Sequence, residues 1–280
     1  DLHSFPTRRS SDLEIENCTG LTSVSIPNSM TQIGDYSFLG CTGLTSVIIP
    51  NSVTQIGISA FKDCSALTSV SISNSITSIS DNAFWGCSGL TSLTLPNGMT
   101  NIGRFAFYKC TGLTSLTIPS SVTSIGEHAF SYCTGLTSIK VESGNTVYDS
   151  RDNCNAVIET TSNTLVVGCK NSTIPNSVTC IGDRSFSGCS GLTSITIPNG
   201  VTSIGAHAFY ECTGLTSVNV PNNVTVIRAD AFYGCSNLTT IAIGSGVKTI
   251  SDYAFSSCTS LTEVYISRSE ERRVGKECRS

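Results

Sequence analysis

Charged side chains are scarce in this chain: Asp, Glu, Lys and Arg make up 13% of its 280 residues, against about 25% in typical domains. The formal net charge is −4, and no basic run occurs within the repeated part of the sequence, which disfavours nucleic-acid binding. No apolar stretch approaches the roughly 20 residues that a membrane-spanning helix needs. The first residues do not have the pattern of a signal peptide.

The motifs that identify enzymes and metal sites are missing too. The chain has no G-x-S-x-G, H-E-x-x-H, phosphate-binding loop or dinucleotide-binding glycine pattern, and no C-x-x-C pair for zinc. Asp149, Asp152 and Asn153 do not have the spacing of a calcium loop. His128 and His207 share a variable position, two residues before a Phe, and are expected to face solvent. We therefore predict a protein that is not an enzyme, with no catalytic residues, no metal and no cofactor.

What the sequence does have is a cysteine every 23 residues. The two runs are Cys18, Cys41, Cys64, Cys87, Cys110 and Cys133, and then Cys189, Cys212, Cys235 and Cys258. A fixed period of this length is typical of a solenoid, in which each repeat is one coil that cannot bury its apolar face alone. The period directs the search for function to a repeated surface rather than to a single pocket.

Each coil carries the pattern L-x-x-L-x-L, the strand signature of a leucine-rich repeat, as at Leu113, Leu116 and Ile118. Proline follows in most coils and ends the strand, because it has no N–H for the ladder. A shorter apolar pair comes next, and an Ala-Phe pair closes the coil in what we interpret as a short helical or 3₁₀ turn. The predicted fold is a leucine-rich repeat solenoid. It is a β-rich right-handed superhelix whose coils each have one main parallel strand, a short second strand and this turn.

The ten periodic cysteines share one position in the coil, and we expect them to form a ladder of buried thiols. Coils stack at roughly 4.8 Å, which is longer than the usual Cβ···Cβ distance of a disulfide. Cys154, Cys169 and Cys180 lie outside this column. A disulfide among those three is left open.

Both ends of the chain fall outside the repeat. Residues 1–13 and 268–280 have no leucine column, are rich in arginine and resemble translated sequencing-adapter sequence. We expect them to be non-native flanks around a single solenoid at 14–267. The chain is then expected to be a fragment, with any signal peptide, anchor or further domain outside it.

One interruption breaks the period, at about 142–173. Two apolar runs, 155–159 and 164–167, flank a short polar loop, which predicts a β-hairpin insertion. The interruption is either a functional loop or a structural excursion that re-enters the ladder. The sequence favours the excursion.

Two surface features are candidates for binding a ligand. The first is the outward column of the main strand, which is expected to lie on the concave side and is mostly small and polar. Its members are Ser25, Ile48, Ser71, Thr94, Thr117, Lys140, Thr196, Asn219, Ala242 and Tyr265. The second is an aromatic stripe formed by the residue after each Phe, which pairs Trp85 with Tyr108 and Tyr210 with Tyr233 on adjacent coils. The alternative is that these rings only cover the outer turn.

The full unit, C-[ST]-G-L-T-S-[VIL]-x-I-P-N-[SG]-V-T-x-I-G-x-x-A-F-x-x-C, resembles the BspA-like leucine-rich repeats over about residues 14–267. These repeats occur in surface proteins of gut and oral bacteria and in some parasitic protists. The resemblance implies a secreted or cell-surface protein that adheres to a host or matrix protein, or to a glycan. It carries over no catalytic residues.

Two alternatives are kept. A carbohydrate-active β-solenoid enzyme would need a cluster of Asp, Lys or Arg on one strand face, which the sequence does not show. An ice-binding or structural spacer would use the regular threonine ladder at Thr22, Thr45, Thr68, Thr91 and Thr114. That function needs a flat T-x-T array, whereas the second position after each Thr is an apolar core column.

Overall fold

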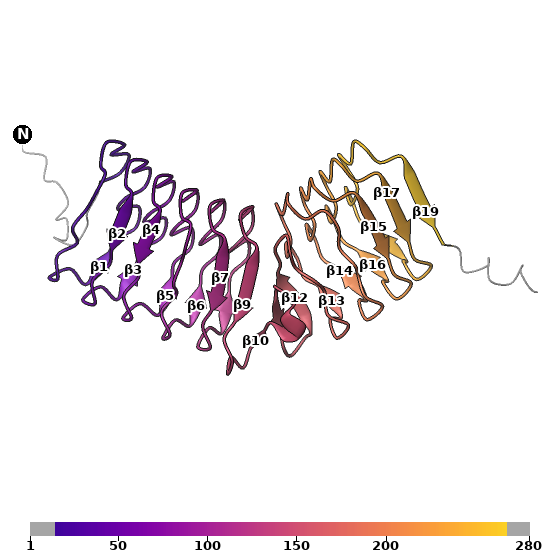
Figure 1. The fold of residues 1–280 in the computed structure, drawn as a ribbon, viewed down its shortest axis with the longest axis horizontal. Helices are drawn as coiled ribbons and strands as arrows, with labels where there is room; N and C mark the ends of the chain where they lie inside the picture. The colour runs from indigo at the N-terminus through magenta and orange to yellow at the C-terminus, as the bar shows by residue number, and fades with distance from the viewer. Residues whose placement is uncertain (1–14, 268–280) are drawn as a thin grey trace, which may run out of the picture. The chain divides into compact units, whose positions relative to one another are not determined.

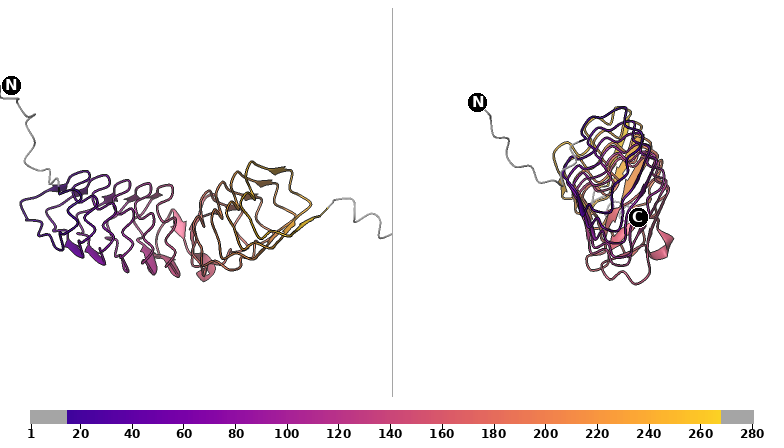
Figure 2. Two further views of the ribbon diagram at one scale, coloured as in Figure 1. Left: turned by 90° about the horizontal axis from the view of Figure 1, so that it is seen from above. Right: turned by 90° about the vertical axis from the view of Figure 1, so that its left-hand side faces the viewer.

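We describe the protein from a computed structural model, which covers residues 15–267 of the chain in detail. The predicted flanks at 1–13 and 268–280 lie outside the described residues, so their nature stays a prediction. The chain divides between Phe130 and Ser131 into two compact units, called unit 1 and unit 2 below and described separately. Each is a stack of similar coils lying side by side (Figures 1 and 2).

Unit 1 has a short second strand in each of its coils, and these strands form one five-stranded parallel sheet in sequence order. They are β1 (Gln32–Ile33), β3 (Gln55–Ile56), β5 (Ser78–Ile79), β6 (Asn101–Ile102) and β8 (Ser124–Ile125). The longer first strands are β2 (Ser46–Ile48), β4 (Ser69–Ser71) and β7 (Ser115–Ile118). Gln32 pairs with Gln55, and Ser46 with Ser69, so the partners are equivalent residues of neighbouring repeats. This register confirms the solenoid.

Unit 2 is built from the same two-strand coil. Its first strands are β9 (Ser138–Val141), β15 (Ser217–Val220), β17 (Thr240–Ile243) and β19 (Glu263–Ile266), of which the last three form a parallel sheet. Its second sheet has seven strands. These are β10 (Tyr148–Asp149), β11 (Val157–Glu159), β12 (Thr164–Val167), β13 (Cys180–Ile181), β14 (Ser203–Ile204), β16 (Val226–Ile227) and β18 (Thr249–Ile250).

The interruption contains the hairpin that the sequence predicted. β11 and β12 pair antiparallel, and β10 adds to β11 antiparallel. β12 then pairs in parallel with β13, which returns the chain to the ladder. The hairpin is therefore part of the seven-stranded sheet of unit 2.

The outer turn differs from the helical or 3₁₀ turn expected from the sequence. Within residues 15–267 the one 3₁₀ segment is η1 (Arg151–Asn153), which lies in the interruption. The outer turns instead place a left-handed residue two positions before each Phe, such as His128 with φ 57° and His207 with φ 55°. A second left-handed residue lies two positions after the Phe, as at Gly40 and Lys109. A left-handed residue ends a right-handed helix, so the segment is a succession of tight turns on both sides of the Phe.

The core is made of columns of equivalent side chains. The phenylalanine rings stack with centroids 5.1–5.4 Å apart from Phe38 to Phe130 in unit 1 and 5.0–5.3 Å apart from Phe186 to Phe255 in unit 2. Their planes are within 10° of parallel. Leucine, valine and isoleucine columns fill the rest of each coil.

The cysteine column is a ladder of buried thiols, as predicted, except that Cys18 is exposed and Cys258 is half-buried. It adds a contact that was not predicted. Most of its thiols donate a hydrogen bond to the Phe carbonyl of the preceding coil, at 3.1 Å from Cys64 Sγ to Phe38 O and 3.1 Å from Cys212 Sγ to Phe186 O. No disulfide joins the cysteines of residues 15–267, which include Cys154, Cys169 and Cys180. Burial raises the pKa of Cys64 to about 12.

Replacement of Phe107 by Ala removes a ring that stacks at 5.4 Å on both Phe84 and Phe130. We expect the free energy of unfolding to fall by about 3–5 kcal/mol, because a buried cavity replaces the ring. Urea unfolding followed by circular dichroism measures this. The control Thr94→Ala alters an exposed side chain and should change the value by less than about 0.5 kcal/mol. Similar losses for both variants would contradict the stacked core.

Stability should fall as the pH rises above about 9. Burial raises the pKa of such a thiol in the folded state, so at high pH the thiol stays protonated there and loses its proton only in the unfolded state. Its contribution to stability is therefore complete below the pKa of the unfolded state and declines as the pH rises toward the pKa of the folded state. Each such thiol contributes up to about 1.4 kcal/mol per pH unit. Urea unfolding between pH 8 and 10.5 in reductant tests this. Cys64→Ala should reduce the slope, whereas the exposed Cys18→Ser should not; equal slopes would contradict the buried ladder.

Candidate functional site

The first candidate surface is the outward side of the first strands, called the strand face below. The main strands alternate between exposed and buried residues, as in β7, β9 and β15. Every residue of the predicted outward column is exposed except Ala242, which is half-buried. The largest apolar member is Ile48, which is 72% exposed.

A second exposed column belongs to the same face and was not identified from the sequence. It lies two residues before the outward column and includes Ser46, Ser69, Ser115, Ser138 and Ser217. The strict alternation of a strand puts both columns on one side. The strand face is therefore two residues wide in each coil.

The threonine ladder beside these columns is occupied by its own hydrogen bonds. The hydroxyl of Thr45 donates to the Thr22 carbonyl at 3.1 Å, and that of Thr239 donates to the Thr216 carbonyl at 3.0 Å. The second residue after Thr45 is Val47, which is buried. The flat array that ice binding requires does not form here.

The strand face of unit 1 is small, polar and uncharged. A shallow hollow on it is lined by Ser71 and Thr94 of the predicted column, together with Asn74, Pro96 and Asn97. Such a surface offers hydroxyl and amide groups but no fixed charge. Any recognition here depends on hydrogen bonding and shape.

The strand face of unit 2 carries two hollows where the interruption meets the ladder, called the insertion hollows below. The first is lined by Ser138, Ile139, Lys140, Val141, Ser150, Asn153 and Asn155. The second is lined by Lys170, Asn171, Ser172, Thr173, Ile174, Ser194, Ile195 and Thr196. Lys140 and Thr196 of the predicted column thus each line one hollow.

A hydrogen-bonded bridge joins the two insertion hollows. The side-chain amide of Asn155 in the first hollow donates to the Asn171 carbonyl in the second at 3.5 Å, and the Ser172 hydroxyl donates to the Asn155 carbonyl. Asn153 and Asn155 both have left-handed backbones. Asparagine adopts that conformation more readily than most residues, which explains why the loop can present two amides here.

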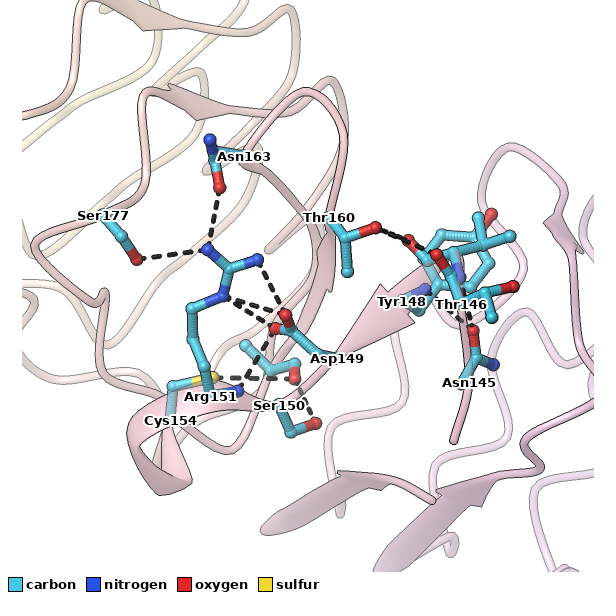
Figure 3. A network of polar contacts seen from close by, with 12 residues as sticks. Asn145, Thr146, Tyr148, Asp149, Ser150, Arg151, Cys154, Thr160, Asn163 and Ser177 are labelled. Atoms are coloured by element: carbon cyan, nitrogen blue, oxygen red, sulfur yellow. Dashed lines mark hydrogen bonds and ion pairs between the residues drawn. The ribbon is translucent and has the colours of Figure 1, made fainter. Parts of the chain in front are cut away.

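The interruption is held in place by Arg151, whose guanidinium group contacts three neighbours (Figure 3). Its Nε lies 2.9 and 3.0 Å from the two carboxylate oxygens of Asp149, and its Nη1 donates to Asn163 at 2.7 Å and to Ser177 at 3.4 Å. The hydrogen-bonded Asp149 carboxylate raises the pKa of Arg151. Arg151 therefore fixes the loop to the hairpin and to the following coil.

Ser150 ties the same loop to the first strand. It accepts the Val141 N–H at 3.0 Å and donates to the Ala156 carbonyl at 2.7 Å. The Asn145 side chain accepts the N–H groups of Val147 and Tyr148 at 2.9 and 2.8 Å. These contacts shape the wall of the first insertion hollow.

The coil after the hairpin is short. Leu165 pairs with Ile181 across β12 and β13, which leaves no room for an outer turn with its own Phe between them. Gly168 lies where that turn would be, and a Cβ on it would meet the Phe186 ring at 2.1 Å. Glycine is thus required where the chain crosses the end of the phenylalanine stack.

Lys170 and Thr173 are site residues that sequence reasoning missed. A usable signal was present, since Thr173 precedes Ile174-Pro175 just as Thr196 precedes Ile197-Pro198. That alignment places Thr173 in the outward column and Lys170 in the threonine ladder. The strand face of unit 2 therefore carries two lysines on neighbouring coils.

Acidic groups are nearly absent from the strand face. Glu263 is the single carboxylate in its two columns, and it accepts a hydrogen bond from the Tyr265 hydroxyl at 2.8 Å. Glycoside hydrolysis generally needs a pair of carboxylates. Among residues 15–267 no group of three His, Cys, Asp or Glu side chains is placed to hold a metal ion.

The aromatic stripe lies on the outer turns. Trp85 and Tyr108 have ring centroids 4.4 Å apart in unit 1, and Tyr210 and Tyr233 stack at 4.9 Å in unit 2. All four rings are half-buried. They cover the turns and present one edge to the surface.

The two histidines do not simply face solvent, as the sequence had suggested. Both are half-buried. His128 stacks on Phe105 at 4.6 Å, and His207 Nε2 lies 3.6 Å from a carboxylate oxygen of Asp230. Their left-handed backbones direct the side chains along the stack, toward the neighbouring coils.

Replacement of Arg151 by Ala should destabilise the interruption by about 1 kcal/mol, since the guanidinium group bridges several partners in a partly buried setting. Lysine should not restore it, because it lacks the planar fork. Hydrogen exchange of the β10–β12 amides measures the effect. Arg228→Ala is the matched control, because Arg228 and Asp183 are 3.7 Å apart and about half exposed. Equal exchange in both variants would contradict the role of Arg151.

Comparisons with known proteins agree with this architecture. The family model described as BspA type Leucine rich repeat region (6 copies) matches residues 14–137, 54–164 and 164–278. No curated protein matches the chain. Within the described part of the chain, no helix has the length and apolar character of a membrane span.

Three solved bacterial structures are similar to this chain over most of their length. A leucine rich cell surface protein from Faecalibacterium prausnitzii is 32% identical, with 90% of this chain and 80% of that chain covered and a TM-score of 0.61. A leucine-rich repeat protein from Eubacterium ventriosum is 28% identical, with coverage of 88% and 72% and a TM-score of 0.71. One from Bacteroides ovatus is 27% identical, with coverage of 92% and 71% and a TM-score of 0.61.

Proposed function

This chain belongs to the BspA-type leucine-rich repeat family, and from that premise we propose that it is a non-enzymatic binding module of a cell-surface or secreted bacterial protein. Its ligand is a host or matrix protein, or a glycan. One similar structure is that of a leucine rich cell surface protein, which supports this location. Adhesion is the role that such a module serves.

We place the ligand contact on the strand face, centred on the insertion hollows. The observation that carries this proposal is the pair of hollows lined by Lys140, Asn153, Asn155, Lys170 and Asn171. In unit 1 the columns of this face carry serine and threonine except at Ile48, whereas here the face offers two cations and three amides around concave surfaces. Concave sites with a few convergent polar groups are where ligands bind.

Two features disfavour the other functions considered. The strand face has one carboxylate in its columns, which does not support a glycoside hydrolase. The threonine hydroxyls donate to carbonyl groups of the preceding coil, which does not support ice binding. A glycan-hydrolysis assay and a thermal-hysteresis assay test these two functions directly.

The binding proposal is tested by presenting the purified protein to a panel of matrix proteins and to a glycan array. The double variant Lys140→Glu/Lys170→Glu should weaken capture of its ligand about tenfold or more, because two cations at the centre of the contact become anions. Thr94→Glu/Thr117→Glu also introduces two carboxylates, with half the change in net charge, on the strand face of unit 1 and reports whether that unit takes part.

Lys248→Glu is the matched control, since Lys248 is exposed and lies outside both hollows. It should retain wild-type binding. Loss of binding in the control as large as in the double variant would show that net charge alone governs capture. Binding unchanged in both double variants, or no ligand on either panel, would overturn the strand-face proposal.

A further inference from the structure

A second surface of unit 1, on the outer turns and away from the strand face columns, gathers aromatic rings. Trp85 and Tyr108 follow the core Phe in consecutive coils, and Phe105 lies between them at 5.2 and 5.5 Å. His128 stacks on Phe105 at 4.6 Å. These four half-buried side chains form one continuous patch, called the outer patch below.

Within the described part of unit 1, residues 15–130, every lysine and arginine lies at the outer patch. The Lys62 ammonium lies 4.8 Å from the Trp85 ring centre, Lys109 lies 5.5 Å from that of Tyr108, and the Arg104 guanidinium lies 6.0 Å from that of Phe105. These are the only lysines and arginines between residues 15 and 130. A part of the chain that is otherwise uncharged or acidic therefore concentrates its positive charge in one place.

The geometry of the rings indicates what the patch can recognise. Lys62 lies over the face of Trp85, and the neighbouring rings pack against one another, so the faces are occupied by contacts within the protein. The cations are therefore the main groups that the patch offers to a ligand, and they favour an anion.

The backbone of these turns is already paired between coils. The Asp63 N–H donates to Trp85 O at 2.6 Å, the Gly86 N–H to Tyr108 O at 2.8 Å and the Phe105 N–H to Glu127 O at 2.9 Å. An extended peptide binds largely through main-chain hydrogen bonds, and these groups are not available for it. Recognition must therefore depend on the anionic groups of the ligand.

Unit 2 does not repeat this cluster of cations, and one equivalent position carries the opposite charge. Glu211 stands beside Tyr210 where Lys109 stands beside Tyr108, and His207 with its neighbour Asp230 replaces Phe105 and its surroundings. Tyr210 and Tyr233 nevertheless stack at 4.9 Å. Stacking of the outer rings therefore does not require cations, and the cations of unit 1 need another explanation.

We propose that the outer patch of unit 1 is a binding site for a polyanionic glycan, a chain that carries sulfate or carboxylate groups. Lys62, Trp85 and Tyr108 occupy one position in three consecutive coils and so form a row along the solenoid. Lys109 and Arg104 flank this row. A linear polyanion laid along it meets positive charge at both ends, and this site is independent of the strand face.

The test uses the whole chain and a heparin oligosaccharide immobilised on a sensor surface. The wild-type protein should bind, and binding should weaken as sodium chloride rises from 50 to 300 mM, because exposed charges are screened. Lys62→Gln/Lys109→Gln should weaken binding about tenfold. Its melting temperature should match that of the wild type, since the core and the rings are retained.

A matched control keeps the proposal falsifiable. Arg228→Gln/Lys248→Gln removes two exposed cations of unit 2 that lie outside the insertion hollows and should leave heparin binding unchanged. If the control pair lowers heparin binding as much as the outer-patch pair does, the outer patch is not the site. The same conclusion follows if the control pair lowers heparin binding and the outer-patch pair does not. Competition by poly-glutamate as effective as that by free heparin would show that any polyanion, including an acidic peptide, suffices and would overturn the glycan assignment. Absence of heparin binding at 50 mM salt would overturn it as well.

Discussion

Equal coil length is the constraint on which the rest of the structure depends. Because neighbouring coils have the same number of residues, the N–H of Thr45 meets the carbonyl of Thr22, and the N–H of Thr68 meets that of Thr45. The same register stacks Phe on Phe and brings most of the periodic cysteine thiols within hydrogen-bond distance of a Phe carbonyl. No coil buries its apolar residues alone, so the backbone ladder and the side-chain columns stabilise each other.

The interruption shows how this constraint can be relaxed at one point. The hairpin of β11 and β12 uses antiparallel pairing to leave the ladder and parallel pairing with β13 to rejoin it. The shortened coil omits an outer turn, which is tolerated because Gly168 lets the backbone pass against Phe186. Arg151 then holds this irregular segment in place through its hydrogen bonds to Asp149, Asn163 and Ser177. The irregular backbone adds to the strand face two hollows lined by lysine and asparagine.

The sequence predicted the features that depend on period and polarity. Side-chain alternation located the buried and exposed strand columns, and two apolar runs located the hairpin. It did not predict the left-handed residues around each Phe, because positions such as Tyr36, Lys109 and Glu211 carry no glycine signal. It also missed the thiol-to-carbonyl hydrogen bonds and the cation–aromatic contacts. Those depend on where turns place side chains between coils, which a one-dimensional pattern does not specify.

The side chains of the strand face and those of the outer turns can each be replaced, but for different reasons. Residues of the strand face point away from the core, and the hydroxyl hydrogen bonds between coils are made by the threonine ladder beside them, so replacing one coil's residue on this face disturbs only its neighbours. On the outer turns, the aromatic ring that follows the core Phe packs along the stack, as Tyr108 and Tyr210 do. The next residue sets the local charge, and it is Lys109 in unit 1 and Glu211 in unit 2. Packing and charge are therefore carried by separate positions. A repeat of this kind can acquire a charged binding patch without altering the contacts that hold its coils together.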